Sequence, residues 1–498
     1  MLFNSYVFLF LFLPVTWVFF RFACSRRLAD VALAVLTVSS LVFYSYWNPP
    51  FVFLILFSIL FNYSWGRLIE RSTATGGTGK AWLAGGVAVN LSLIAYFKYA
   101  DFFLANLALL CGGEWGARHI FLPLGISFFT FQQIAYLIDC SKGLAREHSF
   151  LHYTLFVSFF PQLIAGPIVR YEQIMPQFSR LRTFALSYRN IAMGLTLLSL
   201  GLFKKLVIAD TLSPWAASVF DGGLSPTFFE AWGGTLSYTF QIYFDFSGYS
   251  DMALGLGLLF NIDLPVNFDS PYKAVSVAEF WRRWHISLSS FLKDYLYIPL
   301  GGNRKGPFRR HVNLLATMLL GGLWHGASWN FVAWGGLHGL YLCANHAIGA
   351  LDPLSSLPRI RKLCGWAATF LSVVVSWVFF RASTFARAWE MLRGMSGLNG
   401  VLLPSGSLSS PLAVRMLNAA GVRFAETEHW VTTCGTQQLL VLAACLLLVI
   451  AAPNSIEWTR GRFREGRFTT RWAIAVGGIL LTSICFLDRI SEFLYFQF

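Results

Sequence analysis

Charged side chains are scarce in this chain. They make up 12% of its 498 residues, whereas hydrophobic residues make up 56%. An average soluble domain carries about twice that share of charge, so the composition excludes an ordinary soluble protein. A regular alternation of apolar and polar residues is also missing, which excludes a spanning β-sheet. Helices that cross a membrane are the remaining explanation.

Acidic residues are the scarcest charges. The chain has 24 of them against 38 Lys and Arg, which leaves a net charge of +14. In a soluble protein this excess would suggest a nucleic-acid partner. Here the basic residues gather between apolar segments, as they do in the cytoplasmic loops of membrane proteins, so we expect no nucleic-acid partner. The clearest of these clusters are Arg21–Arg27, Arg67–Lys80, Arg304–Arg310 and Arg460–Arg471.

Metal-binding and linker patterns are absent as well. The eight cysteines include no C-x-x-C pair and most lie in apolar segments, so we expect free thiols and no metal site. No Pro- or Ser-rich linker divides the chain, which predicts a single membrane domain over residues 1–498. Within it, Gly, Trp, His and charges interrupt the apolar runs of residues 227–345, which we call the core block. The lack of an internal repeat argues against inverted-repeat transporter folds.

Long apolar runs are what the sequence does contain. Val31–Trp47, Leu439–Ala452 and Trp472–Leu487 carry no charged side chain and are close to the length that crosses a bilayer. An earlier run, Val7–Phe20, has no convincing cleavage site after it, so we expect an uncleaved anchor. By this length criterion the chain is an all-α polytopic membrane protein with roughly ten to twelve spans.

His325 is the most informative residue of the core block. It follows Trp324 in a long apolar stretch, and Trp329 and Trp334 come soon after it. An ionisable side chain at membrane depth is costly, so it usually faces a protein interior or a wet cavity and serves a function. The tryptophans would keep the imidazole neutral, which is the form that a general base needs, although they could serve packing alone. For His338 we expect a core histidine bonded to a backbone carbonyl.

A second histidine, His285, lies in the segment Glu279–Ile298. At helical spacing Arg282, His285 and Ser289 share one strip, and Trp281 lies on the adjacent apolar side. The strip could offer a cation, a base and a hydroxyl to one ligand. The segment could equally be an interfacial helix whose arginines contact lipid phosphates.

Two carboxylates, Asp245 and Asp251, lie six residues apart in an aromatic segment. Each needs a partner in such surroundings. They could bind a cation, orient a histidine or pair with Arg282, but a structural salt bridge is the more common role. Two aspartates alone do not make a metal site.

Four motifs occur in a familiar order along the chain. They are Leu122–Phe128, Tyr243–Asp251, Phe280–Ser289 with Asp294 and Tyr295, and Leu320–Gly326. Together they resemble the membrane-bound O-acyltransferases. The resemblance is closest to the bacterial branch that O-acetylates exopolysaccharides, such as the alginate-acetylation membrane component, and it covers nearly the whole chain.

The resemblance implies a ring of helices around a central funnel or tunnel, with His325 as the catalytic histidine and His285 as its polar partner. It also implies that the acyl donor enters from the cytoplasm and that the acyl group leaves on the outer side of the bacterial inner membrane. A periplasmic partner would then pass the acetyl group to the polymer. We expect acetyl-CoA as the cosubstrate. The polymer (alginate, cellulose or another glycan) stays open, as does an acylated-enzyme intermediate.

The remaining site residues would take supporting roles. Cations near the cytoplasmic mouth suit the phosphates of coenzyme A, and the candidates are Arg282, Arg283 and Lys293. The side chains expected to contact the substrate are Trp324, Trp281, Asp245 and Ser289. Membrane lipid would surround the protein.

Two other classes of function stay open on the sequence alone. A transporter or flippase of a lipid-linked sugar or acyl carrier would use the same polar cavity without chemistry. A scaffold that anchors a periplasmic complex would not need His325 at all.

Overall fold

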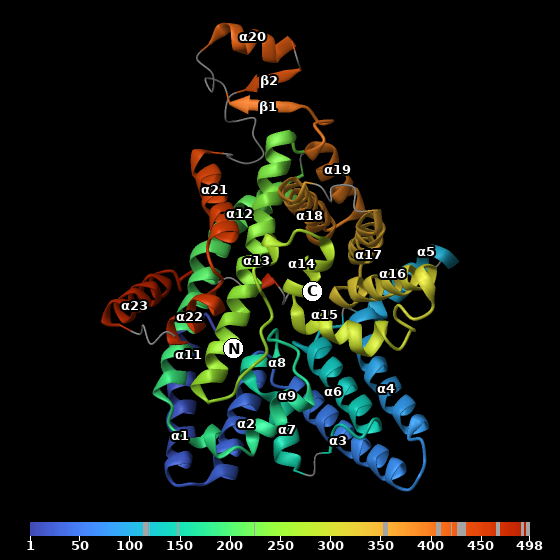
Figure 1. The fold of residues 1–498 in the computed structure, drawn as a ribbon, viewed down its shortest axis with the longest axis vertical. Coiled ribbons are helices and arrows are strands. Elements are labelled where there is room, and N and C mark those ends of the chain that lie inside the picture. Colours follow the sequence, from blue (N-terminus) through green and yellow to red (C-terminus); the bar gives the residue numbers. More distant parts are fainter. Residues whose placement is uncertain are drawn as a thin grey trace.

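The computed structural model describes residues 1–498 except 113–117, 119, 147–148, 224, 352–356, 405–409, 420, 426–434, 465–468, 490–492 and 495–498. Helices make up almost all of the regular structure in this described part (Figure 1). The prediction of an all-α fold is confirmed.

The helices follow one another along the chain. They are α1 (Leu13–Ser25), α2 (Ala29–Ser45), α3 (Phe51–Ala74), α4 (Lys80–Ile94), α5 (Ala100–Cys111), α6 (Ile126–Ser141), α7 (Phe150–Ser158), α8 (Phe160–Leu163), α9 (Tyr171–Phe178), α10 (Leu181–Phe184), α11 (Tyr188–Phe203), α12 (Asp210–Phe220), α13 (Phe228–Leu259), α14 (Val277–Arg283), α15 (Ile286–Leu292), α16 (Gly306–His325), α17 (Trp329–Leu351), α18 (Pro358–Arg381), α19 (Phe385–Met395), α20 (Pro411–Ala419), α21 (Thr436–Ala451), α22 (Ser455–Arg464) and α23 (Thr470–Cys485). Wider or tighter helical turns are η1 (Val7–Phe12), η2 (Ala95–Tyr99), η3 (Lys204–Ala209), η4 (Pro271–Lys273) and η5 (Lys293–Tyr297).

Some of the apolar runs form helices long enough to cross a membrane, whereas Val31–Trp47 and Trp472–Leu487 form the shorter apolar helices α2 and α23. Among the described residues, five helices are long and apolar enough to cross a bilayer, and a bent pair adds a sixth. The five are Val7–Ser25, Phe51–Ala74, Lys80–Cys111, Tyr188–Phe220 and Pro358–Arg381, and the pair is Thr436–Ala451 with Ser455–Phe463. The protein is therefore a multi-pass membrane protein, and the total of ten to twelve spans stays a prediction.

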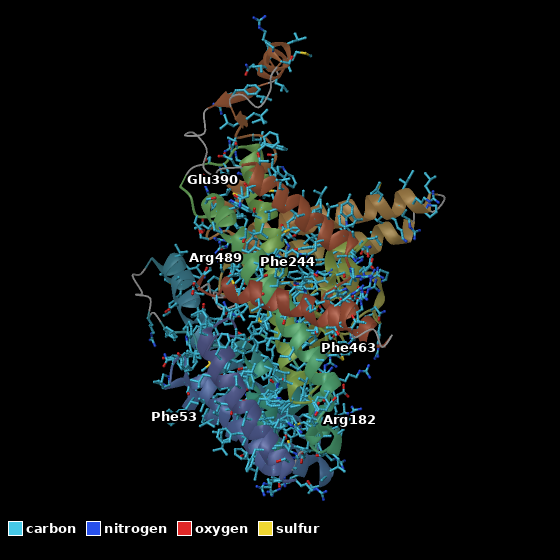
Figure 2. All side chains as sticks on the ribbon, turned by 90° about the vertical axis from the view of Figure 1, so that its left-hand side faces the viewer. Phe53, Arg182, Phe244, Glu390, Phe463 and Arg489 are labelled. Carbon is cyan, nitrogen blue, oxygen red and sulfur yellow. The ribbon has the colours of Figure 1, made fainter. Side chains whose placement is uncertain are left out.

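The longest helix, α13, runs along the long axis of the molecule (Figure 1). Helices α1, α2, α3 and α7 gather at one end of the molecule. Phe244, in the middle of α13, lies near the centre, between Phe53 toward that end and Glu390 toward the other (Figure 2). The core block thus occupies the middle of the fold.

Two aspartates of α13 pair with two consecutive lysines of η3. The Lys204 ammonium lies 2.7 Å from the Asp251 carboxylate, and the Lys205 ammonium lies 2.7 Å from that of Asp245. Lys205 also pairs with Asp210 at 2.9 Å. The two aspartates therefore form structural salt bridges, and their partners are lysines rather than Arg282. Buried charges are tolerated because each finds its counter-charge.

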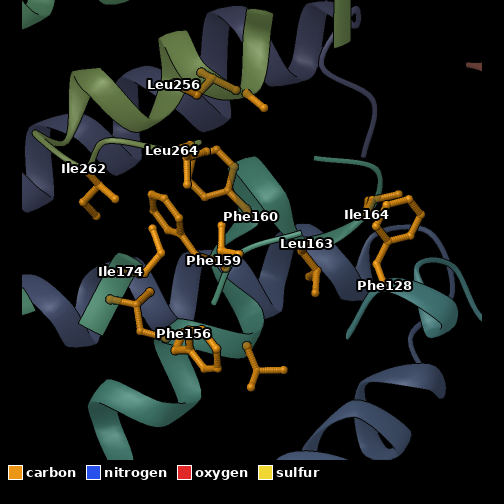
Figure 3. Close-up of a cluster of buried hydrophobic side chains, with 14 of the residues drawn as sticks. Phe128, Phe156, Phe159, Phe160, Leu163, Ile164, Ile174, Leu256, Ile262 and Leu264 are labelled. Atoms are coloured by element: carbon orange, nitrogen blue, oxygen red, sulfur yellow. The ribbon is translucent and has the colours of Figure 1, made fainter. Parts of the chain in front are cut away.

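Part of a large cluster of buried apolar side chains lies where α6, α7, α8 and α13 meet (Figure 3). Phe156, Phe159 and Phe160 fill its centre and are fully buried. Phe128 and Ile164 lie side by side at its edge (Figure 3). This core supports the segments that enclose the cavity described below.

A parallel strand pair, β1 (Val401–Pro404) and β2 (Val422–Ala425), lies with α20 at the end of the molecule opposite α1 (Figure 1). Strands of four residues are too short to show a clear alternation in the sequence, which is why the pair was missed. Strand β1 contacts α13, and Phe228 N–H at the start of α13 donates to the Gly400 carbonyl at 3.0 Å.

Candidate active site

His325 is the last residue of α16. The chain turns there, because Gly326 is extended (φ −167°, ψ 154°) and α17 begins soon afterwards at Trp329. Helices α16 and α17 then pack against each other, with Gly322 and Gly335 at their close approach. A Cβ atom on either glycine would overlap the backbone of the other helix. This contact fixes the position of α16, and with it that of His325.

His285 lies between two short helices rather than within one. Helix α14 ends at Arg283 and α15 begins at Ile286, while His285 itself is left-handed (φ 44°, ψ 54°). The flanking backbone bonds to another segment: Asp269 N–H donates to the Arg283 carbonyl (2.9 Å), and Ile286 N–H donates to the Asn267 carbonyl (3.0 Å). These bonds replace helical ones and break the helix at His285.

Asn267 also holds the His285 ring. Its Oδ1 lies 3.2 Å from His285 Nδ1 and accepts from Ser287 N–H (3.2 Å) and Oγ (2.9 Å). Because a carbonyl oxygen only accepts, Nδ1 carries the proton, and the neutral ring has its lone pair on Nε2. Ser287 Oγ in turn accepts from Ile168 N–H at 3.0 Å. The ring is thus fixed in one tautomer and one orientation.

The structure brings the two histidines together. Their ring centroids are 6.5 Å apart. Trp324 lies 6.3 Å from the His285 ring and 5.1 Å from the His325 ring. Trp334 and Phe380 close the other side of His325, at 5.0 and 5.2 Å. Both histidines are buried, with 1% of His285 and 5% of His325 exposed. Two of the three tryptophans expected around His325 are therefore in contact with it. The third, Trp329, is exposed and donates its indole N–H to Asn106 at 2.9 Å.

A cavity of about 220 Å³, which we call the histidine cavity, opens beside His325. The Leu122–Phe128 motif forms most of its wall, with Ser127 contributing a hydroxyl. Trp324, predicted to contact the substrate, lines it as well. Its other lining residues are Trp47, Lys98, Phe121 and Ile164. A small polar group could thus reach His325.

Lys98 is a site residue that the motif analysis did not find. It lies in the apolar segment Lys80–Cys111 and lines the histidine cavity. Its ammonium donates to the carbonyls of Trp324 (2.6 Å) and His325 (3.1 Å). The available signal was a single cation inside a membrane-spanning helix, which usually marks a functional position.

The strip predicted for Arg282, His285 and Ser289 is wrong, because the helix breaks at His285. Arg282 is exposed, whereas Ser289 Oγ donates to the Trp284 carbonyl at 3.2 Å. Ser289 instead lines a second cavity of about 250 Å³, which we call the tryptophan cavity. Trp281 and Lys293, two other predicted site residues, line it too.

Arg283 is held by acidic neighbours. Its guanidinium donates to Glu279 at 2.8 and 3.0 Å and to the Asp269 carbonyl at 3.0 Å. Arg282, the preceding residue, is exposed, as is Lys293 ten positions later. Lys293 also lies near a carboxylate, at 3.6 Å from Asp294, so two of the three predicted phosphate ligands take part in ion pairs.

His338 belongs to a series of ring contacts that runs from the tryptophan cavity to the histidine cavity. Its Nδ1 accepts from Trp281 Nε1 at 3.3 Å, so the expected bond to a backbone carbonyl is replaced by a side-chain bond. Trp334 contacts His338 at 4.9 Å and His325 at 5.0 Å. Aromatic and imidazole rings thus connect the tryptophan cavity to His325.

Asp245 is engaged elsewhere. One oxygen pairs with Lys205 and the other accepts from Leu494 N–H at 3.0 Å. These contacts do not support the predicted role of Asp245 in substrate binding. Within the described part of the chain, no group of three His, Cys, Asp or Glu side chains could hold a metal ion.

Comparison with known proteins identifies the family. The model of MBOAT, the membrane-bound O-acyltransferase family, matches residues 141–385. A peptidoglycan O-acetyltransferase of Helicobacter pylori is 46% identical over 429 residues, which cover 81% of this chain and 81% of the relative. The chain belongs to the membrane-bound O-acyltransferase family. A probable alginate O-acetylase of Pseudomonas aeruginosa is 43% identical over 400 residues, which cover 79% of this chain and 75% of the relative.

A teichoic acid D-alanyltransferase of Streptococcus thermophilus is a more distant relative. It is 30% identical over 293 residues, which cover 53% of this chain and 69% of the relative. This membrane-bound O-acyltransferase is thus an enzyme that transfers acyl groups, and the predicted bacterial polysaccharide-modifying branch is confirmed.

Proposed function

We propose that this enzyme takes an acetyl group from cytoplasmic acetyl-CoA and delivers it across the bacterial inner membrane for O-acetylation of an exopolysaccharide. The observation that carries the proposal is the position of His325, which is buried beside His285 and lines a cavity. The names of the relatives from Helicobacter pylori and Pseudomonas aeruginosa support a polysaccharide hydroxyl as the final acceptor.

His325 is the general base of the proposed reaction. Its neutral imidazole takes the proton from an acceptor hydroxyl, and the freed oxygen attacks the thioester carbonyl. The tetrahedral intermediate collapses by breaking the carbon–sulfur bond. The thiolate that leaves takes the proton from the imidazolium, so the enzyme returns to its starting state.

His285 is a supporting group in this reaction. Because its Nδ1–H bonds to Asn267, the neutral ring has no second N–H to offer to an oxyanion. It can accept a hydrogen bond through Nε2 and so orient an N–H or O–H of a substrate. Donors for the oxyanion then come from other groups.

The donor enters through the tryptophan cavity. Lys293 and the exposed Arg282 suit the phosphates of coenzyme A near this cavity. The basic cluster Arg304–Arg310 follows in the chain, and the positive-inside rule assigns it to the cytoplasm. Lys293 at the tryptophan cavity, where the donor enters, and His325, where it reacts, both belong to the core block, residues 227–345. A periplasmic partner receives the acetyl group on the opposite side and passes it to the polymer.

Labelled acetyl-CoA tests the proposed function directly. We expect the purified enzyme in liposomes to release free coenzyme A and to transfer the labelled acetyl group to an acceptor hydroxyl. The control is the same preparation carrying His325→Ala. If labelled acetyl-CoA stays intact in both preparations while a lipid-linked sugar crosses the bilayer, the protein is a flippase and the proposal is wrong.

Replacing His285 by alanine should lower the acetyl-transfer rate by about tenfold to a hundredfold. This is less than the effect of removing a general base, because a positioning hydrogen bond contributes less than proton transfer. The measurement is the initial rate of coenzyme A release. Asn267→Ala should reproduce part of this loss, because it frees the His285 ring. Equal and complete loss in His285→Ala and His325→Ala would instead indicate a coupled pair.

A further inference from the structure

We propose that Lys98 is a positioning residue that, together with Tyr99, caps the end of α16 and so holds His325 in place. The inference rests on the proposed function for its kinetic part only. It concerns a residue outside the stretch 141–385 that matches the family model. Lys98 and Tyr99 lie on η2, more than two hundred residues before His325 in the chain.

The end of α16 presents carbonyl groups that have no partner within the helix. The last four carbonyls of any α-helix lack intrahelical donors, and in α16 these belong to residues 322–325. Tyr99 donates its hydroxyl to the Leu323 carbonyl at 2.7 Å. Lys98 donates to the carbonyls of Trp324 at 2.6 Å and His325 at 3.1 Å. Two neighbouring side chains thus satisfy three of the four carbonyls.

The charge of Lys98 matches its position. The C-terminal end of a helix carries a partial negative charge, so a cation there is stabilising. The ammonium also lies 5.8 Å from the centre of the Trp324 ring. Trp324 in turn contacts both histidines. Lys98 therefore holds the backbone of His325 and the aromatic ring between the two imidazoles.

The two consecutive residues that reach the end of α16 lie in the wider turn η2. Ala95–Tyr99 is π-helical, and such turns often occur at functional sites. The turn lies between α4 and α5 within the apolar segment Lys80–Cys111. A lysine at this depth is costly unless its donors are satisfied, and the carbonyls of α16 satisfy them.

The hydrogen bonds of Lys98 favour a positioning role over substrate binding. An ammonium has three N–H donors. The acceptors are the carbonyls of Trp324 and His325 and the Ser127 hydroxyl, at 3.4 Å. All three donors are thus used by the protein, although Lys98 lines the histidine cavity. A substrate would have to displace one of these bonds.

Lys273 offers a matched control. It donates to the Ala452 carbonyl at the end of α21, at 2.6 Å. This is the same kind of contact, a lysine that caps a helix end, but the helix carries neither histidine. Lys273→Met therefore removes a cap without touching α16.

The experiment compares Lys98→Met, Lys98→Arg and Lys273→Met in the full-length enzyme in detergent or liposomes. Its first readout is amide hydrogen exchange of peptides covering residues 320–328. The second is kcat and KM for acetyl-CoA, from the release of coenzyme A. We expect faster exchange in Lys98→Met, and a kcat lowered by about tenfold to a hundredfold with KM changed little, because a small displacement of a catalytic group has this effect.

Lys98→Arg should recover part of kcat and of the protection from exchange, because its guanidinium can still donate to two carbonyls. Lys273→Met should leave the amide exchange of residues 320–328 unchanged, and kcat and KM as well. Unchanged exchange in Lys98→Met would overturn the inference. A raised KM with normal kcat would also overturn it, because it would make Lys98 a substrate ligand. If the wild-type enzyme released no coenzyme A, the proposed function would fail, but the exchange comparison would still decide the role of Lys98.

Discussion

Replacing His325 by alanine should abolish acetyl transfer while leaving the amount of folded protein in the membrane near normal. Removal of a general base costs about a hundredfold to ten-thousandfold in rate. The side chain lies at the end of α16 and lines a cavity, so its loss leaves the helix and the Gly322–Gly335 contact in place. The measurements are coenzyme A release by the purified variant and acetylation of the polymer in cells.

The matched control is His311→Ala, which removes a half-buried histidine from the same helix, fourteen positions away. Its transfer rate should stay close to that of the wild type. Polymer acetylation at the wild-type level in the His325→Ala strain would contradict the mechanism. It would favour a role as a scaffold for a periplasmic complex.

The apolar helices could be predicted from the sequence because hydrophobicity is a local property. The runs Val31–Trp47, Leu439–Ala452 and Trp472–Leu487 match α2, α21 and α23 to within three residues at each end. The lipid environment requires an apolar run of fixed length whatever the rest of the chain does. Tertiary contacts change such a helix little.

The break at His285 could not be predicted in the same way. The residues around it fit a helical period, and no Gly or Pro marks the interruption. The break depends on Asn267, which bonds to the backbone of Ile286 and to the His285 ring from another part of the chain. A pattern within one segment carries no information about such a partner. The prediction that Arg282, His285 and Ser289 share one strip of a helix was wrong for this reason.

The motifs identified the site histidines but not the groups that hold them. His325 and His285 stand out because ionisable residues are rare in this chain. Lys98 is equally rare in its setting, yet its partners are backbone carbonyls, which leave no trace in the sequence. The prediction that Asp245 contacts the substrate failed for the opposite reason. Its rare charge suggested a role in the site, but the carboxylate pairs with Lys205.

Replacing Gly335 by alanine should destabilise the enzyme and reduce acetyl transfer, whereas the same change at the next residue, Gly336, should do neither. By helix propensity alone, alanine gains about 1 kcal/mol over glycine at both positions. At Gly335 the new Cβ would overlap the Met318 carbonyl of α16, and backbone cannot move aside as a side chain can. At Gly336 it would meet only the Leu319 side chain, at an ordinary 3.4 Å.

Overpacking of this kind costs about 1–3 kcal/mol, which exceeds the gain in propensity. Separation of α16 from α17 would also displace His325, and a displacement of about 1 Å can lower a rate a hundredfold. The measurements are the thermal unfolding midpoint in detergent and the rate of coenzyme A release. Equal behaviour of Gly335→Ala and Gly336→Ala would mean that the α16–α17 contact does not position His325. A loss confined to Gly335→Ala would show that the closeness of these two helices, which requires glycine, sets the geometry of the catalytic histidine.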